Sequence, residues 1–397
     1  MTDFAETRRL FQLPDGIAYL DGNSLGPLPR ATPSKLERTL HEEWGQHLVG
    51  AWNVDGWMDQ PSRVGDRIGR LLNAPPGQVV VGDTLSIKVH QALAAALEAT
   101  DRKVILTDHG NFPSDVYVAE GLAATLGEGH GIRRVPPEGV ASAIDEEVAV
   151  LLLTHVDYRT GRMYDMAGLT RRAHEVGALC VWDLAHSAGA VPVDLLGSEA
   201  DYAVGCTYKY LNGGPGSPAF LYAAPDRASS ARPTIPGWLG HADPFAFEPT
   251  YRPARDVMRF RIGTPAVLQM AALEASLDIW DQVDIHEIHR ESIRLSERLI
   301  AGIEARCGEE LQLASPRDPA QRGSHVSFHH PDGYAVVQAC IDRGVIGDFR
   351  APDILRFGIT PLYLGDREID HAVSTLTEVV QRRLWEADRY RVRRTVT

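Results

Sequence analysis

Two polar side chains stand where apolar segments of this chain end, and their chemistries complement each other. The apolar run 178–182 leads into Asp183, and Lys209 follows the run 201–205 and precedes a loop with three glycines. A lysine amine can bind the aldehyde of pyridoxal 5'-phosphate (PLP) covalently, while a carboxylate can keep the pyridine nitrogen protonated. Alone, such a lysine is usually a solvated surface residue and such an aspartate a turn former or helix cap. In this order, the pair predicts a PLP site.

The segments around this pair alternate between strand and helix lengths. Apolar runs at 79–81, 103–106 and 148–153 precede helical patterns at 87–100, 115–126 and 166–176. This alternation indicates βαβ units and a mostly parallel sheet, which places the chain in the α/β class. Such sheets bind ligands beyond the carboxyl ends of their strands, where Asp183 is expected.

The chain divides into three parts by its pattern. An N-terminal segment, 1–50, holds the turn-rich stretch 19–27 and an amphipathic helix near 33–48. A large domain is expected over 51–283. A smaller α+β domain, 284–397, includes a connecting helix, strands near 324–328, 345 and 355–359, and a final helix over 366–383.

The net charge and the cysteine content limit the kinds of molecule that this protein is expected to bind. The 397 residues carry a formal charge of −13, which argues against a nucleic-acid or anionic-membrane partner. Four cysteines lie far apart with no CxxC pair, which predicts buried thiols in a reducing compartment and no metal site. The N-terminus shows no signal peptide and the apolar runs are strand-sized, so a cytoplasmic protein without a membrane span is expected.

The sequence around Asp183 and Lys209 resembles that of kynureninase, a PLP enzyme of tryptophan catabolism and the kynurenine pathway. The stretches 181–195 and 206–217 carry the resemblance, which extends from Tyr19 through 322–328 to Arg350 and Tyr363. It implies the PLP-dependent transferase fold type I, with a mixed, mostly parallel sheet in the large domain. The implied reaction is hydrolysis of L-kynurenine at its Cβ–Cγ bond to anthranilate and L-alanine.

The segment 83–86 lies between a strand and a helix, where free amides and the Ser86 hydroxyl could hold a phosphate. Helix capping by Asp83 or Ser86 uses the same amides, so both readings stay open. The resemblance implies that Leu85 and Ser86 bind the cofactor. Many relatives have asparagine at the position of Lys88, whose side chain could add charge near the phosphate or point to solvent.

The resemblance assigns further cofactor contacts to residues that could otherwise be structural. An isolated phenylalanine is usually core, and a histidine near an aspartate is usually structural. Asp201 could simply begin a strand, whereas the resemblance implies a contact to the region of Lys209. The resemblance implies that Phe112 stacks on the cofactor ring and that Asp115 makes a polar contact in the same site. It implies that His186 contacts the cofactor and that Tyr208 binds its phosphate and helps proton transfer. Lys209, Asp183 and Tyr208 are therefore the expected catalytic residues.

The resemblance implies a homodimer with shared active sites. In two turn-like loops, Trp238 and Thr264 match kynureninase residues that reach the phosphate bound by the partner subunit, although a packed tryptophan and a capping threonine would give the same sequence pattern. The α-carboxylate of the substrate needs a bidentate arginine, for which Arg356 matches the family and Arg350 is the competitor.

The residues expected around the aromatic ring of the substrate resemble those of bacterial-type kynureninases. Trp52, Gly263 and Thr264 match the residues of that type, which implies a preference for L-kynurenine and leaves 3-hydroxykynurenine as a weaker substrate. Two alternatives remain. A cysteine desulfurase would need a nucleophilic cysteine on a mobile loop, and a PLP-fold binding protein would show no turnover.

Overall fold

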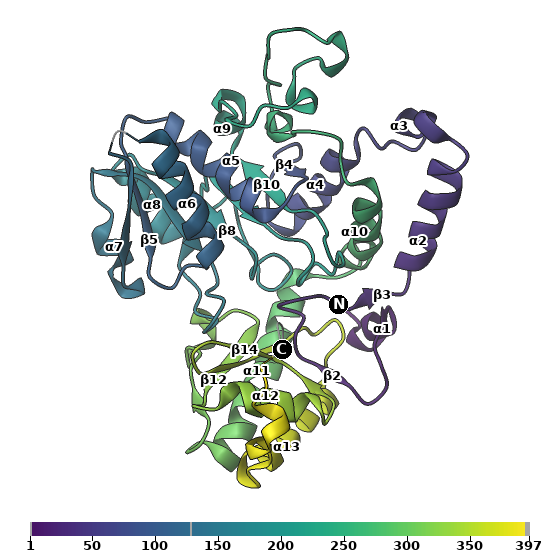
Figure 1. Ribbon diagram of the computed structural model, residues 1–397, viewed down its shortest axis with the longest axis vertical. Helices are drawn as coiled ribbons and strands as arrows, with labels where there is room; N and C mark the ends of the chain where they lie inside the picture. The colour runs from purple at the N-terminus through teal and green to yellow at the C-terminus, as the bar shows by residue number, and fades with distance from the viewer. Residues whose placement is uncertain (1, 128, 394–397) are drawn as a thin grey trace.

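A mixed sheet of seven strands forms the centre of the larger domain in the computed structural model, which describes residues 2–127 and 129–393 (Figure 1). Within these residues, the antiparallel pairs of this sheet are those that β10 forms with β4 and β9, and the other strand pairs are parallel. The prediction of a mostly parallel α/β sheet is confirmed. The spatial order is β4 (Val79–Val81), β10 (Phe220–Ala223), β9 (Tyr202–Gly205), β8 (Leu179–Asp183), β7 (Val148–Thr154), β5 (Val104–Asp108) and β6 (Gly131–Val135).

Helices cover both faces of this sheet, because alternate strand residues point to opposite sides. In β8, Val181 packs in one cluster with α5 (Leu85–Glu98) and α6 (Pro113–Leu126). Its neighbour Trp182 packs in another with α4 (Gln60–Leu71), α8 (Met166–Glu175) and α10 (Val267–Trp280). Since both faces are covered, the inner strands β7, β8 and β9 are almost entirely apolar, as expected of a buried parallel sheet.

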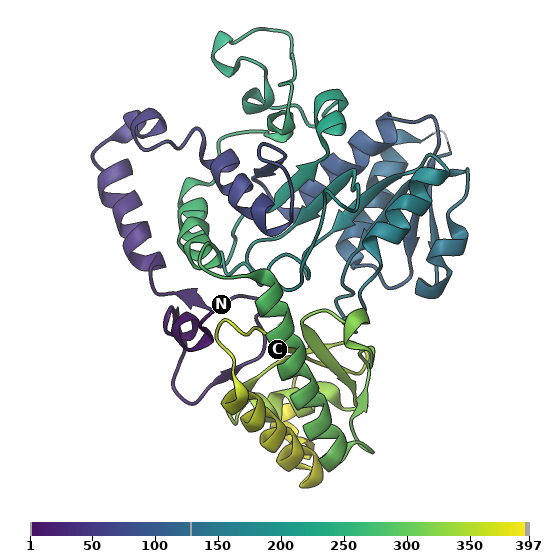
Figure 2. The same ribbon diagram turned by 180° about the vertical axis from the view of Figure 1, so that it is seen from behind.

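The smaller domain is a four-stranded antiparallel sheet packed against helices. The strands run in the order β11 (Gln312–Leu313), β12 (His325–His329), β15 (Ile354–Gly358) and β14 (Asp348–Arg350). The helices α11 (Ile285–Cys307) and α13 (Asp366–Gln381) lie side by side, with α12 (Gly333–Ile341) beside them (Figures 1 and 2). Figure 2 shows α11 running from the larger domain into the smaller one.

The N-terminal segment packs against the smaller domain. After α1 (Phe4–Arg9) and the pair β1 (Phe11–Gln12) with β3 (Leu28–Pro29), the strand β2 (Ala18–Tyr19) pairs in parallel with β13 (Val345–Ile346). The amide of Gly358 donates to the carbonyl of Leu20 at 2.7 Å. Residues 20–24 therefore lie beside β14 and β15.

The helix predicted over 33–48 is shorter than expected. The structure has α2 (Thr32–Arg38), a π-helical turn (Thr39–Trp44), a 3₁₀ turn (Leu48–Gly50) and α3 (Ala51–Val54). Leu48 has a positive φ of 53°, which a continuing α-helix does not allow. This arm projects from the body of the molecule (Figure 1).

Short elements complete the chain: α7 (Val140–Ala143), α9 (Pro225–Ser230) and 3₁₀ turns at Pro137–Gly139, Trp238–Gly240, Pro244–Ala246, Val257–Phe260, Pro319–Gln321, Leu384–Glu386 and Asp388–Tyr390. In the part of the chain that the structure describes, no helix is long and apolar enough to cross a membrane.

Candidate functional site

The predicted aspartate and lysine meet at the carboxyl edge of the large sheet. Asp183 is the last residue of β8, where it is paired in register with Thr154 of β7 and Val204 of β9. Lys209 follows the end of β9 by four residues. Parallel strands deliver their carboxyl ends to one edge, which explains why residues far apart in sequence converge there.

The Lys209 amine is enclosed by three of the residues predicted to surround it. Its side chain is buried, with Nζ 3.4 Å from His186 Nε2. The same Nζ lies 5.8 Å from the ring centroids of Phe112 and Tyr208. Burial, followed by the nearby Lys209, lowers the pKa of His186 well below its ordinary value, so the imidazole is neutral at pH 7. A neutral imidazole can accept a hydrogen bond from the lysine amine.

Asp183 and Asp115 form a buried carboxyl pair. The two side chains share a hydrogen bond, and both are almost completely shielded from solvent. Burial raises the pKa of both, but Lys209 and the Ala185 amide, which donates to Asp183 at 2.8 Å, counteract this for Asp183. For Asp115, the neighbouring Asp183 raises the pKa further. Asp115 therefore carries the shared proton and Asp183 the negative charge.

Sequence reasoning missed two residues beside this pair. Thr154 donates to Asn111 Oδ1 at 2.5 Å, and its hydroxyl lies close enough to Asp115 and Asp183 to influence the pKa of both carboxyl groups. Asn111 in turn donates to Thr107 Oγ1 at 2.9 Å. Both are common strand-end residues, and only the register between β7 and β8 would have singled out Thr154.

The N-terminus of α5 has the free amides that a phosphate needs. The helix begins at Leu85, with Ser86 in its first turn and Thr84 as N-cap, so neither Asp83 nor Ser86 is the cap. The Thr84 side chain makes no capping hydrogen bond, which leaves the first-turn amides available to an anion. Asp83 O accepts from the amide of Ala219, so this turn lies beside the loop that follows Lys209.

Lys88 does not point to solvent, which was one of the two orientations considered from the sequence. Its side chain is completely buried and donates to Gln91 Oε1 at 2.9 Å and to the carbonyl of Phe260 at 3.0 Å. Its amine is also 3.3 Å from Asp83 Oδ2. Lys88 thereby ties the start of α5 to the segment that leads to Gly263 and Thr264.

Some predicted residues lie apart from Lys209 within one chain. Trp238 is exposed and stacks edge-on against Phe245, and Gly263 and Thr264 are exposed beside the same loop. Trp52 lies on α3 of the projecting arm, packed edge-on against Trp57 (Figure 1).

Asp201 lies at the start of β9, whereas Lys209 follows the other end of that strand. Its carboxylate accepts from the Cys180 amide and from Arg227 Nε, each at 2.9 Å, and pairs with His174. These contacts correspond to a strand-start residue rather than to a contact near Lys209.

Arg356 stands on β15 in a buried ion pair. Its Nε donates to Asp348 Oδ1 at 2.8 Å, its Nη2 donates to Asp348 Oδ2, and its Nη1 donates to the carbonyl of Tyr158 at 2.5 Å. Tyr158 stacks edge-on against Phe112, with the ring centroids 5.1 Å apart. Arg356, the arginine predicted to bind the substrate carboxylate, is therefore linked through Tyr158 to Phe112, which lies beside Lys209.

The donor set fits PLP. A buried amine suits the aldehyde, a charged buried carboxylate suits a protonated ring nitrogen, and an uncapped helix end suits the phosphate. Asp115 Oδ2 is a buried oxygen with no hydrogen-bond partner within the protein, as expected where a further polar group belongs.

Curated relatives cover almost the whole chain. A kynureninase from Pseudomonas fluorescens is 49% identical over 400 residues, covering 99% of this chain and 96% of that protein. A kynureninase from Burkholderia pseudomallei strain K96243 is 46% identical with the same coverage. The chain belongs to the kynureninase family. The model of the kynureninase C-terminal domain matches residues 288–376.

Solved structures confirm the fold of this kynureninase-family chain. A cysteine desulfurase from Thermococcus onnurineus superimposes with a TM-score of 0.81 at 17% identity, covering 96% of this chain and 99% of that one. A C-DES mutant with glycine covalently linked to the PLP cofactor gives 0.79 at 20% identity, covering 95% and 100%. The predicted PLP-dependent fold type I is therefore confirmed.

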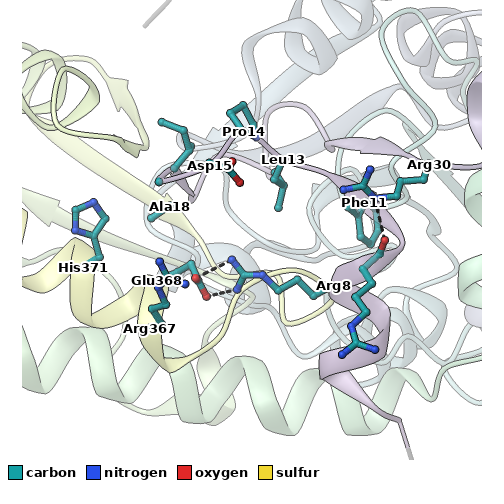
Figure 3. A pocket seen from close by; sticks show the side chains of 13 residues that line it. Arg8, Phe11, Leu13, Pro14, Asp15, Ala18, Arg30, Arg367, Glu368 and His371 are labelled. Atoms are coloured by element: carbon teal, nitrogen blue, oxygen red, sulfur yellow. Dashed lines mark hydrogen bonds and ion pairs between the residues drawn. The ribbon is translucent and has the colours of Figure 1, made fainter.

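A cavity of about 650 Å³ lies away from these residues, between the N-terminal segment and α13. Figure 3 shows Arg8, Arg30 and His371 around it, with Arg8 paired to Glu368. It is lined by none of the predicted site residues, and its ion pair joins α1 to α13. Its contacts fit a role in holding the N-terminal segment on the smaller domain.

His325 on β12 should make the stability of the fold depend on pH. It is fully buried near His186, Arg356, Asp348 and Lys209, and burial lowers its pKa to about 3. An unfolded histidine titrates near 6.5, so the unfolded chain binds more protons between these values and the free energy of unfolding falls as pH drops below about 6.5. At pH 5 the loss from this one group is about 2 kcal/mol.

Urea denaturation of H325Q at pH 7 and pH 5 measures this effect. The fall in the free energy of unfolding between the two pH values should be about 2 kcal/mol smaller than in the wild type. H371Q, at an exposed histidine, is the matched control and should keep the wild-type difference. An unchanged difference in H325Q would show that His325 is protonated in the folded protein.

Proposed function

We propose that this chain hydrolyses L-kynurenine to anthranilate and L-alanine with PLP as cofactor. The observation that carries the proposal is the 49% identity to a curated kynureninase across 99% of the chain. The Lys209–Asp183 arrangement supports it independently, because it supplies an amine and a charged carboxylate to one buried place.

PLP, when bound, supplies an electron sink for the bonds at the substrate's Cα. Lys209 is the proposed covalent attachment point, Asp183 the partner of the ring nitrogen, and Phe112 the group against the ring face. Leu85 and Ser86 would hold the phosphate at the start of α5, with Tyr208 and His186 as further contacts. Asp115 supports Asp183 by donating a hydrogen bond to it.

The chain's own residues then handle the protons. Lys209 Nζ, when free, is the proposed base for the Cα proton, and the neutral His186 beside it can accept a hydrogen bond from the lysine amine. Burial raises the pKa of the Tyr208 phenol, so it stays protonated and can donate to the carbon that becomes the methyl group of alanine. One water molecule is consumed when the Cβ–Cγ bond breaks. Its OH becomes part of the anthranilate carboxyl group, and a hydrogen is added to Cβ, which becomes the methyl group of alanine.

The proposed substrate contacts are Arg356 at the α-carboxylate and Trp52, Gly263 and Thr264 around the aromatic ring. Trp52, Gly263 and Thr264 offer no carboxylate or amine side chain to a ring hydroxyl. We therefore expect a higher kcat/KM for L-kynurenine than for 3-hydroxykynurenine.

A homodimer with shared sites is part of the proposal. Trp238, Gly263 and Thr264 are exposed in one chain, and exposed aromatic residues Phe245 and Phe247 extend the same loop. The projecting loop and arm (Figure 1) are surfaces that a second copy can cover, so that Trp238 and Thr264 reach the phosphate of its site. The cytoplasm is the proposed location.

A cysteine desulfurase is the second candidate because solved desulfurases share the fold. All four cysteines are buried, in or beside regular elements, and burial raises the pKa of Cys340 to about 12. A buried, protonated thiol is a poor nucleophile. The cysteines therefore argue against a desulfurase.

Anthranilate fluorescence together with the absorbance spectrum of the purified protein tests the proposed function. We expect a visible PLP band and anthranilate release from L-kynurenine, with slower release of the hydroxylated product from 3-hydroxykynurenine. A PLP band without hydrolysis of either substrate would contradict the reaction. No band after added PLP would contradict the cofactor site.

A further inference from the structure

A second arginine shares the ion pair that holds Arg356. Arg350 on β14 donates from Nη2 to Asp348 Oδ2 at 2.6 Å and to Ser24 Oγ at 3.1 Å. Arg356 Nη2 donates to the same Ser24 oxygen at 2.9 Å. The two guanidinium groups therefore have nitrogen atoms within about 6 Å of each other, close enough for one carboxylate to accept from both.

The two arginines differ in how many donors remain. Arg356 is 1% exposed and uses all three of its nitrogens on Asp348, Ser24 and the Tyr158 carbonyl. The Arg350 side chain is 36% exposed, and its Nε is buried without a hydrogen-bond partner among the described residues. Arg350 thus has donors left for a ligand, whereas Arg356 is almost fully committed to the protein.

The charges in this cluster leave room for one anion. Burial would raise the pKa of Asp348, but Arg356 and Arg350 hold it below its ordinary value, so Asp348 is charged. Burial, together with Asp348, raises the pKa of Asp21 to about 7, so Asp21 is only partly ionised at neutral pH and leaves part of the remaining positive charge uncancelled. Two guanidinium groups against one full carboxylate leave an excess of up to one positive charge, which matches one substrate carboxylate.

The cluster is close to the cofactor residues. The positive charge of Arg350 acts on Tyr208, Tyr158 and His186, each of which lies at or next to the Lys209 site. A substrate held near Lys209 can therefore present its α-carboxylate to this cluster.

We propose that Arg350 binds the substrate's α-carboxylate together with Arg356, and that Asp348 and Ser24 position the two guanidinium groups for it. This inference rests on the proposed function and names a second specificity residue for it. Arg356 supplies a fixed positive charge, and the partly exposed Arg350 supplies the Nε–H donor that the described residues leave without a partner. Asp348 acts through the arginines and is a positioning residue.

The test uses R350Q and R350K as PLP-loaded holoenzymes. L-Alanine and ethylamine, its counterpart without a carboxylate, are titrated separately while the PLP absorbance is followed. A lost charge-assisted hydrogen bond should weaken L-alanine binding by about 10- to 100-fold in R350Q and leave ethylamine binding unchanged. R350K should recover part of the loss, because lysine keeps the charge without the planar fork.

R298Q is the matched control. Arg298 also forms a two-point pair with an aspartate of the smaller domain, Asp370, with both contacts at 2.7 Å, but at the exposed surface. It should bind L-alanine as the wild type does. Wild-type L-alanine binding in R350Q would overturn the proposal, and so would an equal loss for L-alanine and ethylamine, since that loss would not depend on the carboxylate.

The positioning role is tested with D348N and S24A. S24A removes the shared oxygen without leaving a buried charge unpaired, so it remains informative if D348N fails to fold. We expect KM for L-kynurenine to rise about 3- to 10-fold in S24A while kcat changes less than twofold. An unchanged KM in S24A would contradict the positioning role. Wild-type protein that binds PLP but releases no anthranilate would instead contradict the proposed function, whatever the variants do.

Discussion

Replacing Lys209 with alanine should abolish multiple turnover of L-kynurenine, with a loss in rate on the order of 10⁴-fold or more. Lys209 is the proposed attachment point and the base nearest to the reacting carbon, so its removal takes away two functions at once. Its amine is buried beside His186, at 3.4 Å, and between the rings of Phe112 and Tyr208. The amine of Lys88 cannot substitute for it, because Lys88 is held by Gln91 and Phe260.

Anthranilate fluorescence measures the rate, and the absorbance spectrum reports whether the cofactor is attached. Borohydride reduction of the wild type followed by peptide mapping should place the cofactor on Lys209 alone among Lys35, Lys88, Lys103 and Lys209. K103A is the matched control, since Lys103 precedes β5 at the amino edge of the sheet, opposite the site. Label on another lysine, or full activity in K209A, would refute the assignment.

The large sheet was predictable because its strands are short, apolar and separated by helix-length segments. β7 and β8 follow this rule, and the predicted and observed bounds differ by a residue or less. β6 was not predicted, since Arg133 and Arg134 interrupt its apolar pattern. The edge position of β6 allows such side chains, but position within a sheet cannot be read from a single strand.

The candidate site was predictable where one motif holds its residues and not where register or packing brings them together. Asp183, His186, Tyr208 and Lys209 come from two short stretches of sequence. Asp348 lies on a strand of three residues, and its role depends on β14 and β15 placing Asp348 opposite Arg356. Ser24 joins them only because β2 pairs with β13, a contact between residues more than 300 positions apart in the chain.

The Asp183–Asp115 pair explains how a buried carboxylate can stay charged. Two carboxylates this close cannot both ionise without a large cost, so one proton is shared between them. Asp183 receives the Ala185 amide and the positive Lys209, which favour the charge on that side. Asp115 has a buried, unpartnered Oδ2, which fits the protonated member. The carboxyl edge of β8 therefore presents one fixed negative charge at the position proposed for the ring nitrogen.

D183N should consequently be far more damaging than D115N. An amide at position 183 cannot balance a protonated ring nitrogen, so kcat should fall by about 10³-fold. Asparagine at position 115 still donates a hydrogen bond to Asp183, so kcat should fall by about 10-fold or less. Both substitutions preserve side-chain volume, and each variant serves as the control for the other.

Rates are measured by anthranilate release at saturating L-kynurenine, after the PLP content of each variant has been matched by absorbance. If Asp115 carried the charge, the order of the two variants would be reversed. The double variant adds a further check, since residues that share a proton should not act additively. A double variant no slower than D183N would show that Asp115 acts only through Asp183, whereas a full multiplication of the two losses would mean that the two carboxyl groups act independently.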